Sequence, residues 1–458
     1  MLRIINPATE ELVNEVEADS ADSVVAKYEQ ARAAQPGWAA RSFEEKAVVL
    51  KRFGEILISR RAELAAVLTS EMGKPLNQAK GEIRGVQGRV DFFISEIEKT
   101  IATQEMHRAA DGSMTEAVSY EPLGVIGNIS AWNYPYFVGS NVFVPALLVG
   151  NTMLYKPSEF ATLTGLEMAR ALHEAGVPED VFVPVVGDGK VGKALLDQPL
   201  DGMFFTGSHA TGVKIAEAAS RKMMRVQLEL GGKDPSYVAD DVPDVAAVAD
   251  SVAGGVFYNA GQSCCSIERV YVHEAVYDQF LGAFLKAVEG YRVGNPTEDG
   301  VFIGPLTREP QRSVLAEQVA DALAKGASLR LGGKAMEGSG YFFEPTVLTE
   351  VNHSMLVMQE ESFGPIIGIQ KVSSDDVALE LMNDTRYGLT ASVYTADETR
   401  ARSLMMRLNA GSVYWNCCDR VSPRLPWTGW GDSGVGSTLG LDGIRAFVQP
   451  KAWHLRQG

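Results

Sequence analysis

The strongest constraint on the fold is an alternation of short apolar runs with helical stretches, which begins after Glu121. Helical segments such as 164–175 and 210–220 lie between the runs. The runs of strand length are 125–129, 152–155, 181–186, 203–205 and 225–230. Strands that alternate with helices form a parallel sheet covered on both faces. The middle of the chain is therefore predicted to be α/β.

A second series of strands follows, which predicts a second α/β domain. Its members are 269–272, 328–331, 366–369, 391–394 and 412–415. No low-complexity linker separates the two series. We therefore expect a tight cleft between the domains, which is a common place for a ligand site.

The N-terminal fifth, from about 20 to 100, has a helical pattern, and Ser42 to Glu45 forms a capping-box sequence ahead of its apolar positions. Between 101 and 120 the pattern changes to short polar-apolar alternations around Asp111-Gly112, a strong two-residue hairpin signal. The sequence therefore predicts a helical layer followed by a protruding β-ribbon.

Composition narrows the class of protein. Of the 458 residues, 46% are hydrophobic and 22% charged, as in globular proteins, and the formal net charge is −16. A surface of that sign repels nucleic acid and anionic membranes. No signal peptide or membrane span is expected, and the four cysteines, in two adjacent pairs, match neither a disulfide framework nor a zinc spacing. We expect a cytoplasmic protein without a metal.

Cys264, in Gly261-Gln-Ser-Cys264, is a candidate nucleophile. A cysteine just after a glycine can lie near free backbone N–H groups, and helix N-terminal amides lower the pKa of a thiol. The alternative is that Cys264 and Cys265 are two small buried cysteines, and the pair alone leaves both interpretations open.

Two further polar residues stand at predicted strand ends. Glu229 precedes the bend at Gly231-Gly232, and burial there would raise its pKa toward that of a general base. Asn133 ends another strand, where its amide could donate to an oxyanion. Taken singly, these residues could equally be a solvated charge and part of an aromatic-rich turn.

Two strand-to-helix turns could hold a dinucleotide. Gly207-Ser208 leads into a helix start, where backbone amides and a hydroxyl can bind a pyrophosphate. Lys156-Pro-Ser158-Glu159 supplies a cation, and a carboxylate suited to a ribose 2′-hydroxyl. Each turn alone could also be an ordinary polar connection.

Taken together, these motifs resemble the aldehyde dehydrogenase superfamily from near Asn6 to Trp453. The stretches that carry the resemblance, in family order, are Trp132-Asn-Tyr-Pro135, Lys156-Pro-Ser-Glu159, Phe205-Thr-Gly-Ser208, Glu229-Leu-Gly-Gly-Lys233, Gly261-Gln-Ser-Cys264, Glu360-Glu-Ser-Phe-Gly-Pro365 and Asn383-x-x-x-Tyr387-Gly-Leu389.

The resemblance implies a reaction and a role for each catalytic residue. Cys264 would be the nucleophile, Asn133 and the Cys264 N–H the oxyanion hole, and Glu229 the base that activates the deacylating water. The product would be a carboxylic acid, and Cys265 would have no necessary role.

It also implies a cofactor, NAD, with NADP as the alternative. Glu159 favours NAD because its carboxylate would repel a 2′-phosphate. The residues implied to bind this cofactor are Lys156, Ser158, Glu159, Gly207, Ser208, Glu361 and Phe363.

The implied fold is a Rossmann-like cofactor domain, an α/β catalytic domain and a β-ribbon oligomerisation arm, assembled as a homodimer or homotetramer. The expected cofactor domain comprises 1–103 and 123–229, the catalytic domain 230–441, and the arm 104–122 and 442–458. The chain departs from the family pattern at Gly431, in place of a lysine, and Thr438, in place of a glutamate. Both positions are expected to lie outside the catalytic set.

The substrate is the least determined feature. Family members that oxidise succinate semialdehyde typically carry an arginine eight residues after the asparagine, and some carry another six before the nucleophile. Here those positions are Asn141 and Tyr258. Since burying an unpaired carboxylate is costly, we expect apolar aliphatic or aromatic aldehydes, with Tyr136, Phe137, Phe257, Tyr258 and Trp427 near the tunnel. Arg420 and Arg424 keep succinate semialdehyde as an alternative.

The residues of this chain disfavour three other functions. Acyl transfer to coenzyme A is disfavoured by Glu229, since a base that delivers water works against holding a thioester. A catalytically silent structural homologue is disfavoured because every chemical residue is present. A cysteine hydrolase is disfavoured because none of the six histidines stands in a motif that would place it beside Cys264.

Overall fold

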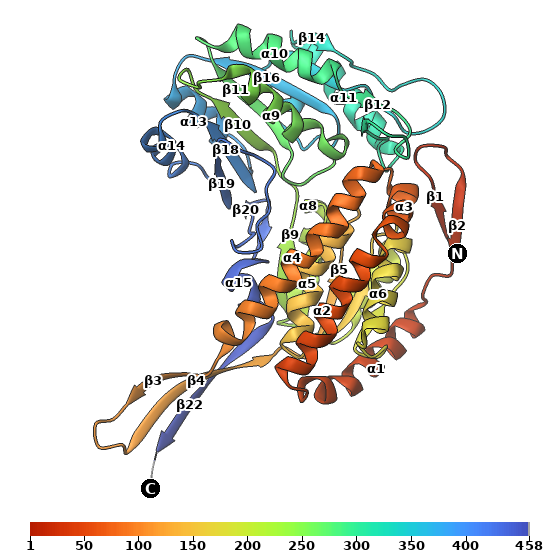
Figure 1. The fold of residues 1–458 in the computed structure, drawn as a ribbon, viewed down its shortest axis with the longest axis vertical. Coiled ribbons are helices and arrows are strands. Elements are labelled where there is room, and N and C mark those ends of the chain that lie inside the picture. The colour runs from red at the N-terminus through yellow and green to blue at the C-terminus, as the bar shows by residue number, and fades with distance from the viewer. Residues whose placement is uncertain (457–458) are drawn as a thin grey trace.

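The computed structural model describes residues 1–456 and contains two α/β lobes and a projecting ribbon (Figure 1). The N-terminal hairpin of β1 (Leu2–Ile5) and β2 (Leu12–Val16) precedes the predicted helical layer. That layer is α1 (Ala21–Ala39), α2 (Phe43–Ser59), α3 (Arg61–Met72) and α4 (Leu76–Ile101). The capping box is confirmed, because Ser42 Oγ accepts from Glu45 N at 3.2 Å and Glu45 Oε2 accepts from Ser42 N at 2.8 Å.

The first lobe contains a six-stranded sheet in the order β21-β9-β8-β5-β6-β7. Its strands are β5 (Val125–Ile129), β6 (Thr152–Lys156), β7 (Phe182–Pro184), β8 (Gly202–Thr206), β9 (Arg225–Glu229) and β21 (Gly434–Val435). Only β21 runs antiparallel to its neighbour. The connecting helices are α5 (Pro135–Leu148), α6 (Thr162–Ala175), α7 (Gly189–Asp197) and α8 (His209–Ser220). The five predicted strands are confirmed, although β7 is shorter than expected because Pro184 has no N–H for the ladder.

The second lobe contains a seven-stranded sheet in the order β14-β15-β16-β11-β10-β18-β19. Its strands are β10 (Asp234–Val238), β11 (Ile267–His273), β14 (Ser328–Leu331), β15 (Thr346–Thr349), β16 (Ile366–Val372), β18 (Thr390–Tyr394) and β19 (Ser412–Trp415). Its helices are α9 (Val245–Phe257), α10 (Tyr277–Glu289), α11 (Pro310–Ala324), α12 (Leu356–Gln359), α13 (Asp375–Asn383) and α14 (Glu398–Met405). The five predicted strands are present. β10 and β15 were missed because Pro235 lies inside β10 and Pro345 directly precedes β15, and proline is unusual in a strand sequence.

Minor elements complete the fold. They are η1 (Tyr258–Gly261), β12 (Arg292–Val293) with β13 (Val301–Ile303), β17 (Tyr387–Gly388) with β20 (Trp430–Gly431), and α15 (Gly440–Arg445). Among residues 1–456, no helix combines the length and the apolar character needed to cross a membrane.

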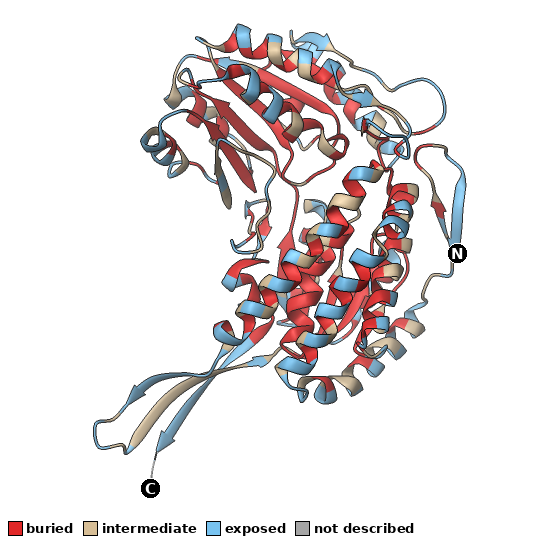
Figure 2. Cartoon of the chain, viewed as in Figure 1, coloured by how far each residue is buried: buried red, intermediate tan, exposed pale blue. Residues whose placement is uncertain are grey.

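The predicted ribbon is confirmed and has three antiparallel strands. The Asp111-Gly112 turn joins β3 (Gln104–Arg108) to β4 (Met114–Pro122), and β22 (Val448–Arg456) pairs along the whole of β4. The ribbon projects from the first lobe with its strands largely exposed (Figures 1 and 2). The last two residues of the predicted arm segment, 457–458, lie outside the described residues.

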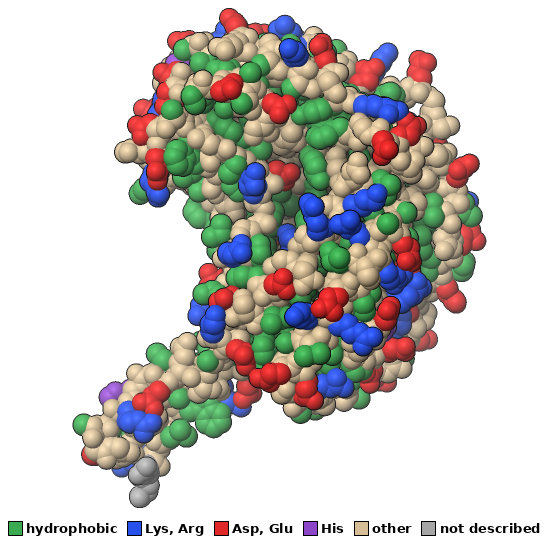
Figure 3. Space-filling model, in the orientation of Figure 1, with side chains coloured by type: hydrophobic (Ala, Val, Ile, Leu, Met, Phe, Trp, Pro, Cys, Tyr) green, Lys and Arg blue, Asp and Glu red, His purple; other side chains and the backbone are tan. Residues whose placement is uncertain are grey.

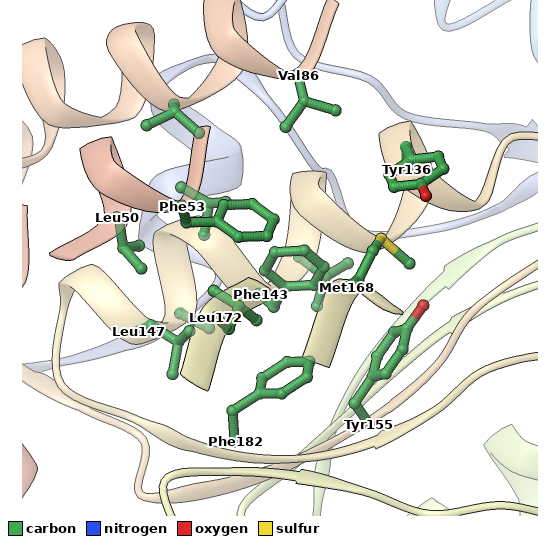
Figure 4. Close-up of a cluster of buried hydrophobic side chains, with 14 of the residues drawn as sticks. Leu50, Phe53, Val86, Tyr136, Phe143, Leu147, Tyr155, Met168, Leu172 and Phe182 are labelled. Carbon is green, nitrogen blue, oxygen red and sulfur yellow. The ribbon is translucent and has the colours of Figure 1, made fainter. Parts of the chain in front are cut away.

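The largest core fixes α5 against the first sheet (Figure 4). Phe143 of α5 makes edge-to-face contacts with Phe53 of α2 at 5.7 Å and with Phe182 of β7 at 5.3 Å between ring centroids. Tyr136 lies in the same cluster and is fully buried. The helix that follows Asn133 is therefore packed against both α2 and the first sheet.

Candidate active site

The predicted site residues follow the ends of neighbouring strands. Glu229 ends β9, Gly207 and Ser208 follow β8, Asn133 follows β5, and Lys156 ends β6. These four strands are adjacent and parallel, so their carboxyl ends form one edge of the sheet. Cys264 and Phe363 instead precede β11 and β16, which are paired in the second sheet. The site thus combines the carboxyl edge of one sheet with loops at the amino edge of the other.

Cys264 lies in a turn between η1 and β11, and no helix begins there. The thiol therefore lies in a turn and not at a helix N-terminus. The chain instead makes an unusual bend in which Asn259, Ala260 and Gly261 have φ of 54°, 56° and 70°. A Cβ at Gly261 would lie 2.3 Å from the Gly364 carbonyl oxygen, so only glycine fits. This strained turn brings the cysteine loop against the loop before β16.

The two adjacent cysteines have different surroundings. Cys264 is half-buried, whereas Cys265 is buried and its Sγ donates to Asp419 Oδ1 at 3.1 Å. Interaction with the Cys264 side chain and burial raise the pKa of the Cys265 thiol well above its ordinary value. Of this pair, Cys264 is the accessible thiol.

Asn133 is buried, and its backbone is anchored while its side chain is free. Its carbonyl oxygen accepts from Lys74 Nζ at 2.6 Å and from Asn259 Nδ2 at 3.4 Å. Asn259 also donates to the carbonyl of Gln262, two residues before Cys264. Within residues 1–456 the Asn133 amide makes no hydrogen bond, so it can donate to a ligand. Lys74, which sequence reasoning missed, is itself buried and paired with Glu82.

Glu229 is buried, and only one oxygen of its carboxyl group is hydrogen-bonded. Oε1 accepts from Gln227 Nε2 at 2.7 Å and from Thr438 Oγ1 at 3.2 Å, whereas Oε2 is buried without a partner in the described chain. Burial raises the pKa of Glu229 well above its ordinary value, as expected for a base. Thr438, which was expected outside the catalytic set, is in direct contact with the candidate base, because the β21 edge strand and the bridge to Trp427 bring it to Glu229.

The paired glycines after Glu229 allow a close approach. A Cβ at Gly231 would lie 2.3 Å from Glu361 Oε1, and one at Gly232 would lie 2.9 Å from the Cys264 carbonyl oxygen. Glu361 Oε1 accepts from Gly232 N at 3.1 Å. Burial and the nearby Glu268 raise the pKa of Glu361. The bend therefore brings the base, the nucleophile loop and Glu361 together.

A buried ion pair supports the loop that carries Phe363. Glu268 Oε2 pairs with Lys233 Nζ at 2.7 Å and accepts from Ser362 N, while its Oε1 accepts from Phe363 N at 2.9 Å. The Phe363 ring meets Trp132 edge-to-face at 5.5 Å. Glu268 was missed by sequence reasoning, since its partners lie 94 and 95 residues away.

The expected cofactor residues lie on the two turns after β6 and β8. Lys156 is buried with Nζ 3.9 Å from Glu159 Oε2, and burial lowers its pKa. Ser158 is buried, and Glu159 is half-buried. Ser208 is exposed at the N-cap of α8 without capping it, so the first N–H groups of that helix are open to an anion. Gly207 N donates to the Glu229 carbonyl oxygen at 3.0 Å and so joins this turn to the base. These residues fit a dinucleotide.

The aromatic residues expected at the tunnel divide into two groups. Tyr136 and Phe257 are fully buried in core clusters, so neither side chain is open to a substrate. Phe137 and Tyr258 are half-buried, and Trp427 is almost fully buried. Arg420 and Arg424 are exposed. Another arginine, Arg89 of α4, donates from Nε to Asn141 Oδ1 at 2.8 Å, which sequence spacing gave no means of predicting.

The arrangement can support covalent acyl chemistry. It contains the accessible thiol of Cys264, the free side-chain amide of Asn133 and the buried carboxyl group of Glu229. The turns after β6 and β8, at the same edge of the first sheet, could hold a dinucleotide. No group of His, Cys, Asp and Glu in the described chain could hold a metal ion.

Comparison with known proteins agrees with this chemistry. The model of the aldehyde dehydrogenase family matches residues 1–453. A peroxisomal aminoaldehyde dehydrogenase 1 of Malus domestica is 36% identical, covering 98% of this chain and 91% of its own length. A putative succinate-semialdehyde dehydrogenase [NADP(+)] of Mycolicibacterium smegmatis is 37% identical, covering 94% and 84%. A solved indole-3-acetaldehyde dehydrogenase with NAD+ has a TM-score of 0.96 at 31% identity, covering 99% and 93%.

Proposed function

The chain belongs to the aldehyde dehydrogenase family and is an enzyme that oxidises aldehydes, and on that premise we propose that it converts an aldehyde to a carboxylic acid through a thioester on Cys264. The observations that support this proposal are an accessible Cys264 thiol, a free Asn133 amide whose backbone is joined to the cysteine loop through Asn259, and a buried Glu229 carboxyl group followed by a glycine bend that meets the same loop. Substrate and cofactor selection belong to the same proposal.

The first step is attack by the Cys264 thiolate on the aldehyde carbon. The carbonyl oxygen becomes an oxyanion, and the Asn133 side-chain amide and the Cys264 backbone N–H donate to it. Because Lys74 and Asn259 hold the Asn133 backbone, this donor is placed before substrate arrives. Preorganised donors stabilise developing charge without reorganisation.

NAD fits the two turns after β6 and β8. The open amino end of α8 with Ser208 and Gly207 would hold the pyrophosphate, and Lys156, Ser158 and Glu159 would hold the adenosine ribose. Glu361 and Phe363 would face the nicotinamide end. When bound, NAD would accept the two electrons and the hydrogen removed from the aldehyde carbon. Glu159 supports NAD over NADP because its carboxylate would repel a 2′-phosphate.

Hydrolysis of the thioester is assigned to Glu229. Its raised pKa lets the carboxylate take a proton from water near neutral pH, and its unpartnered Oε2 is the oxygen available for this. Acyl transfer to coenzyme A stays the weaker alternative, since a base placed to deliver water competes with a second thiol. A catalytically silent homologue is likewise disfavoured by the intact set of chemical residues.

We expect Cys264→Ala to abolish aldehyde oxidation and Cys265→Ala to keep most of it. The measurement is NADH formation over aliphatic, aromatic, amino and carboxylated aldehydes, with NADP run in parallel and coenzyme A added in a second series. Product analysis then separates acid from acyl-coenzyme A. Equal loss in both cysteine variants, or activity that survives Cys264→Ala, would contradict the proposal.

Assembly is also part of the proposal. The exposed ribbon of β3, β4 and β22 supports an oligomerisation arm at 104–122 and 442–456, with a cofactor domain at 1–103 and 123–229 and a catalytic domain at 230–441. The four cysteines are free thiols, which supports a reducing compartment such as the cytoplasm.

A further inference from the structure

Arg89 is a buried cation beside the predicted substrate path. It lies on α4, which packs along α5 (Figure 1), and its residue exposure is 5%. The guanidinium lies 3.6 Å from the centroid of the Phe137 ring. Its Nε donates to Asn141 Oδ1 at 2.8 Å and its Nη1 donates to the Gly85 carbonyl oxygen at 3.2 Å. The guanidinium is thereby held in one orientation.

The charge of Arg89 has no carboxylate partner in the described chain. Glu82 is the acidic group whose charge attracts the Arg89 guanidinium. However, Glu82 already pairs with Lys74 and accepts a hydrogen bond from Tyr136 N at 2.9 Å. Asp419 is the other acidic group near the cysteine loop, and its electrostatic attraction is to Lys74 and Arg420. Desolvation lowers the pKa of Arg89 to about 10, so the group stays charged at neutral pH. An unpaired buried charge is costly and indicates a ligand of opposite charge.

Two donors at this position are left without partners. Arg89 Nη2 makes no hydrogen bond within residues 1–456, and the same holds for Asn141 Nδ2, because the amide oxygen of Asn141 is the atom that faces Arg89. A guanidinium and an amide side by side match the two oxygens of a carboxylate.

The position of Arg89 relative to the candidate site follows from α5 and the turn before it. Phe137 and Asn141 are four residues apart on α5 and lie on one face of that helix. The Phe137 ring stacks on Tyr134 with 6.3 Å between ring centroids, and Tyr134 directly follows Asn133 in the turn before α5. The guanidinium contacts both Phe137 and Asn141, so it lies over the first two turns of the helix that follows the candidate oxyanion donor. A Cβ at Gly85 would lie 2.6 Å from the Phe137 ring, so glycine there lets the ring and the arginine lie against α4. Lysine and arginine side chains also gather beside the hollow between the lobes (Figure 3).

We propose that Arg89 and Asn141 form an anion subsite that binds the distal carboxylate of an aldehyde acid whose aldehyde carbon reaches Cys264. This inference rests on the proposed function and names its substrate class. It is an alternative to the expectation of apolar substrates, which assumed that Asn141 left this position without a cation. The cation is present, but it comes from α4.

The test compares ω-oxo carboxylates of four to six carbons with unsubstituted aldehydes of the same length. We expect the native enzyme to have a higher kcat/KM for the carboxylates, mainly through KM. Arg89→Met, which keeps the length of the stem, should lower the ratio of the two kcat/KM values by at least about tenfold, as expected for lost charge-assisted hydrogen bonds. Arg89→Lys should recover part of the ratio. Arg84→Met, an exposed arginine on the same helix, is the matched control and should keep the native ratio.

A binding readout tests the subsite without turnover. Glutarate should slow alkylation of Cys264 by iodoacetamide in the native enzyme and fail to do so in Arg89→Met. The inference would be overturned if Arg89→Met and Arg89→Lys lowered kcat/KM equally for the carboxylates and for the unsubstituted aldehydes. It would also be overturned if the native enzyme preferred the unsubstituted aldehydes. Either result would leave the proposed function intact. Absence of NADH with every aldehyde, together with protection by glutarate, would instead overturn the proposed function and retain the subsite.

Discussion

Burial of the Glu229 carboxyl group affects folding as well as catalysis. The folded state keeps this group protonated to a higher pH than the unfolded chain does, because burial raises its pKa. Between the unfolded and folded pKa values the folded state therefore binds more protons, and stability falls as pH rises. Each unit of such a shift costs about 1.4 kcal/mol.

We therefore expect Glu229→Gln to raise the melting temperature at pH 8, with the gain shrinking as the pH falls toward about 4, below the ordinary pKa of 4.5, where both states hold most of the proton. Thermal unfolding across this pH range is the measurement. Glu217→Gln, on the exposed face of α8, is the control and should show no pH-dependent gain. A gain that grows as pH falls would contradict the assigned sign.

Thr438 is expected to position Glu229 through its hydroxyl. That hydrogen bond favours the charged carboxylate and so lowers the pKa of Glu229 against the effect of burial. Thr438→Val should move the midpoint of the kcat–pH profile upward by about one to two units, since hydrogen bonds to charged groups contribute about 1.5–3 kcal/mol. Thr438→Ser keeps the donor and should restore the native midpoint. An unmoved midpoint in Thr438→Val would assign the residue a packing role only.

At the scale of elements, the loop before β16 depends on a charge pair at its base. Lys233 directly precedes β10 and Glu268 lies on the neighbouring strand β11, so their ion pair supports the Phe363 loop at the amino edge of the second sheet. Both side chains are buried, and burial lowers the pKa of Lys233. Removing one partner of a buried pair leaves the other charge uncompensated.

Glu268→Gln should lower the stability of the protein by about 3–5 kcal/mol, because it leaves Lys233 buried without a counter-charge. The double variant Lys233→Met/Glu268→Gln removes both charges and should recover most of the loss. Denaturant unfolding of the three variants, including Lys233→Met alone, gives the coupling between the two sites. Additive effects would mean that the pair contributes nothing beyond its separate members.

At the scale of the whole molecule, the ribbon carries apolar side chains into solvent. Met106, Trp453 and Leu455 are 63%, 42% and 51% exposed on strands that project from the first lobe (Figure 2). Its outer strands β3 and β22 also have open edges in this chain. Exposed apolar patches and open strand edges are typical of interfaces between chains.

We expect the native protein to have a mass that is two or four times the 49.5 kDa of one chain. Trp453→Glu should reduce this mass, because a charge on the ribbon would have to be buried in the interface. Light scattering after size-exclusion chromatography measures the mass of the native protein and of the Trp453→Glu variant. Met406→Glu, at an exposed position outside the arm, is the control. A native mass equal to that of one chain would contradict a role of the ribbon in oligomerisation.

The sequence alone determined features that depend on residues close together along the chain. Strand and helix periodicity predicted both sheets, and Asp111-Gly112 predicted the hairpin. A cysteine after a glycine and two polar residues at strand ends identified Cys264, Glu229 and Asn133 as candidates. Local patterns carry this information because capping, turn geometry and side-chain alternation act over a few residues. The strands β10 and β15 were not predicted because a proline lies within the first and directly before the second, which is unusual in a strand sequence.

Contacts between distant segments were decided only by the tertiary structure. Thr438 meets Glu229 across 209 residues, and Arg89 meets Asn141 across 52. Neither separation has a period that a sequence pattern can reveal, since packing of α4 on α5 and pairing of β21 with β9 create these neighbours. The pKa and the charge of a buried group depend on such neighbours. The tertiary structure therefore determines the pKa of Glu229 and places the charge of Arg89 beside Asn141.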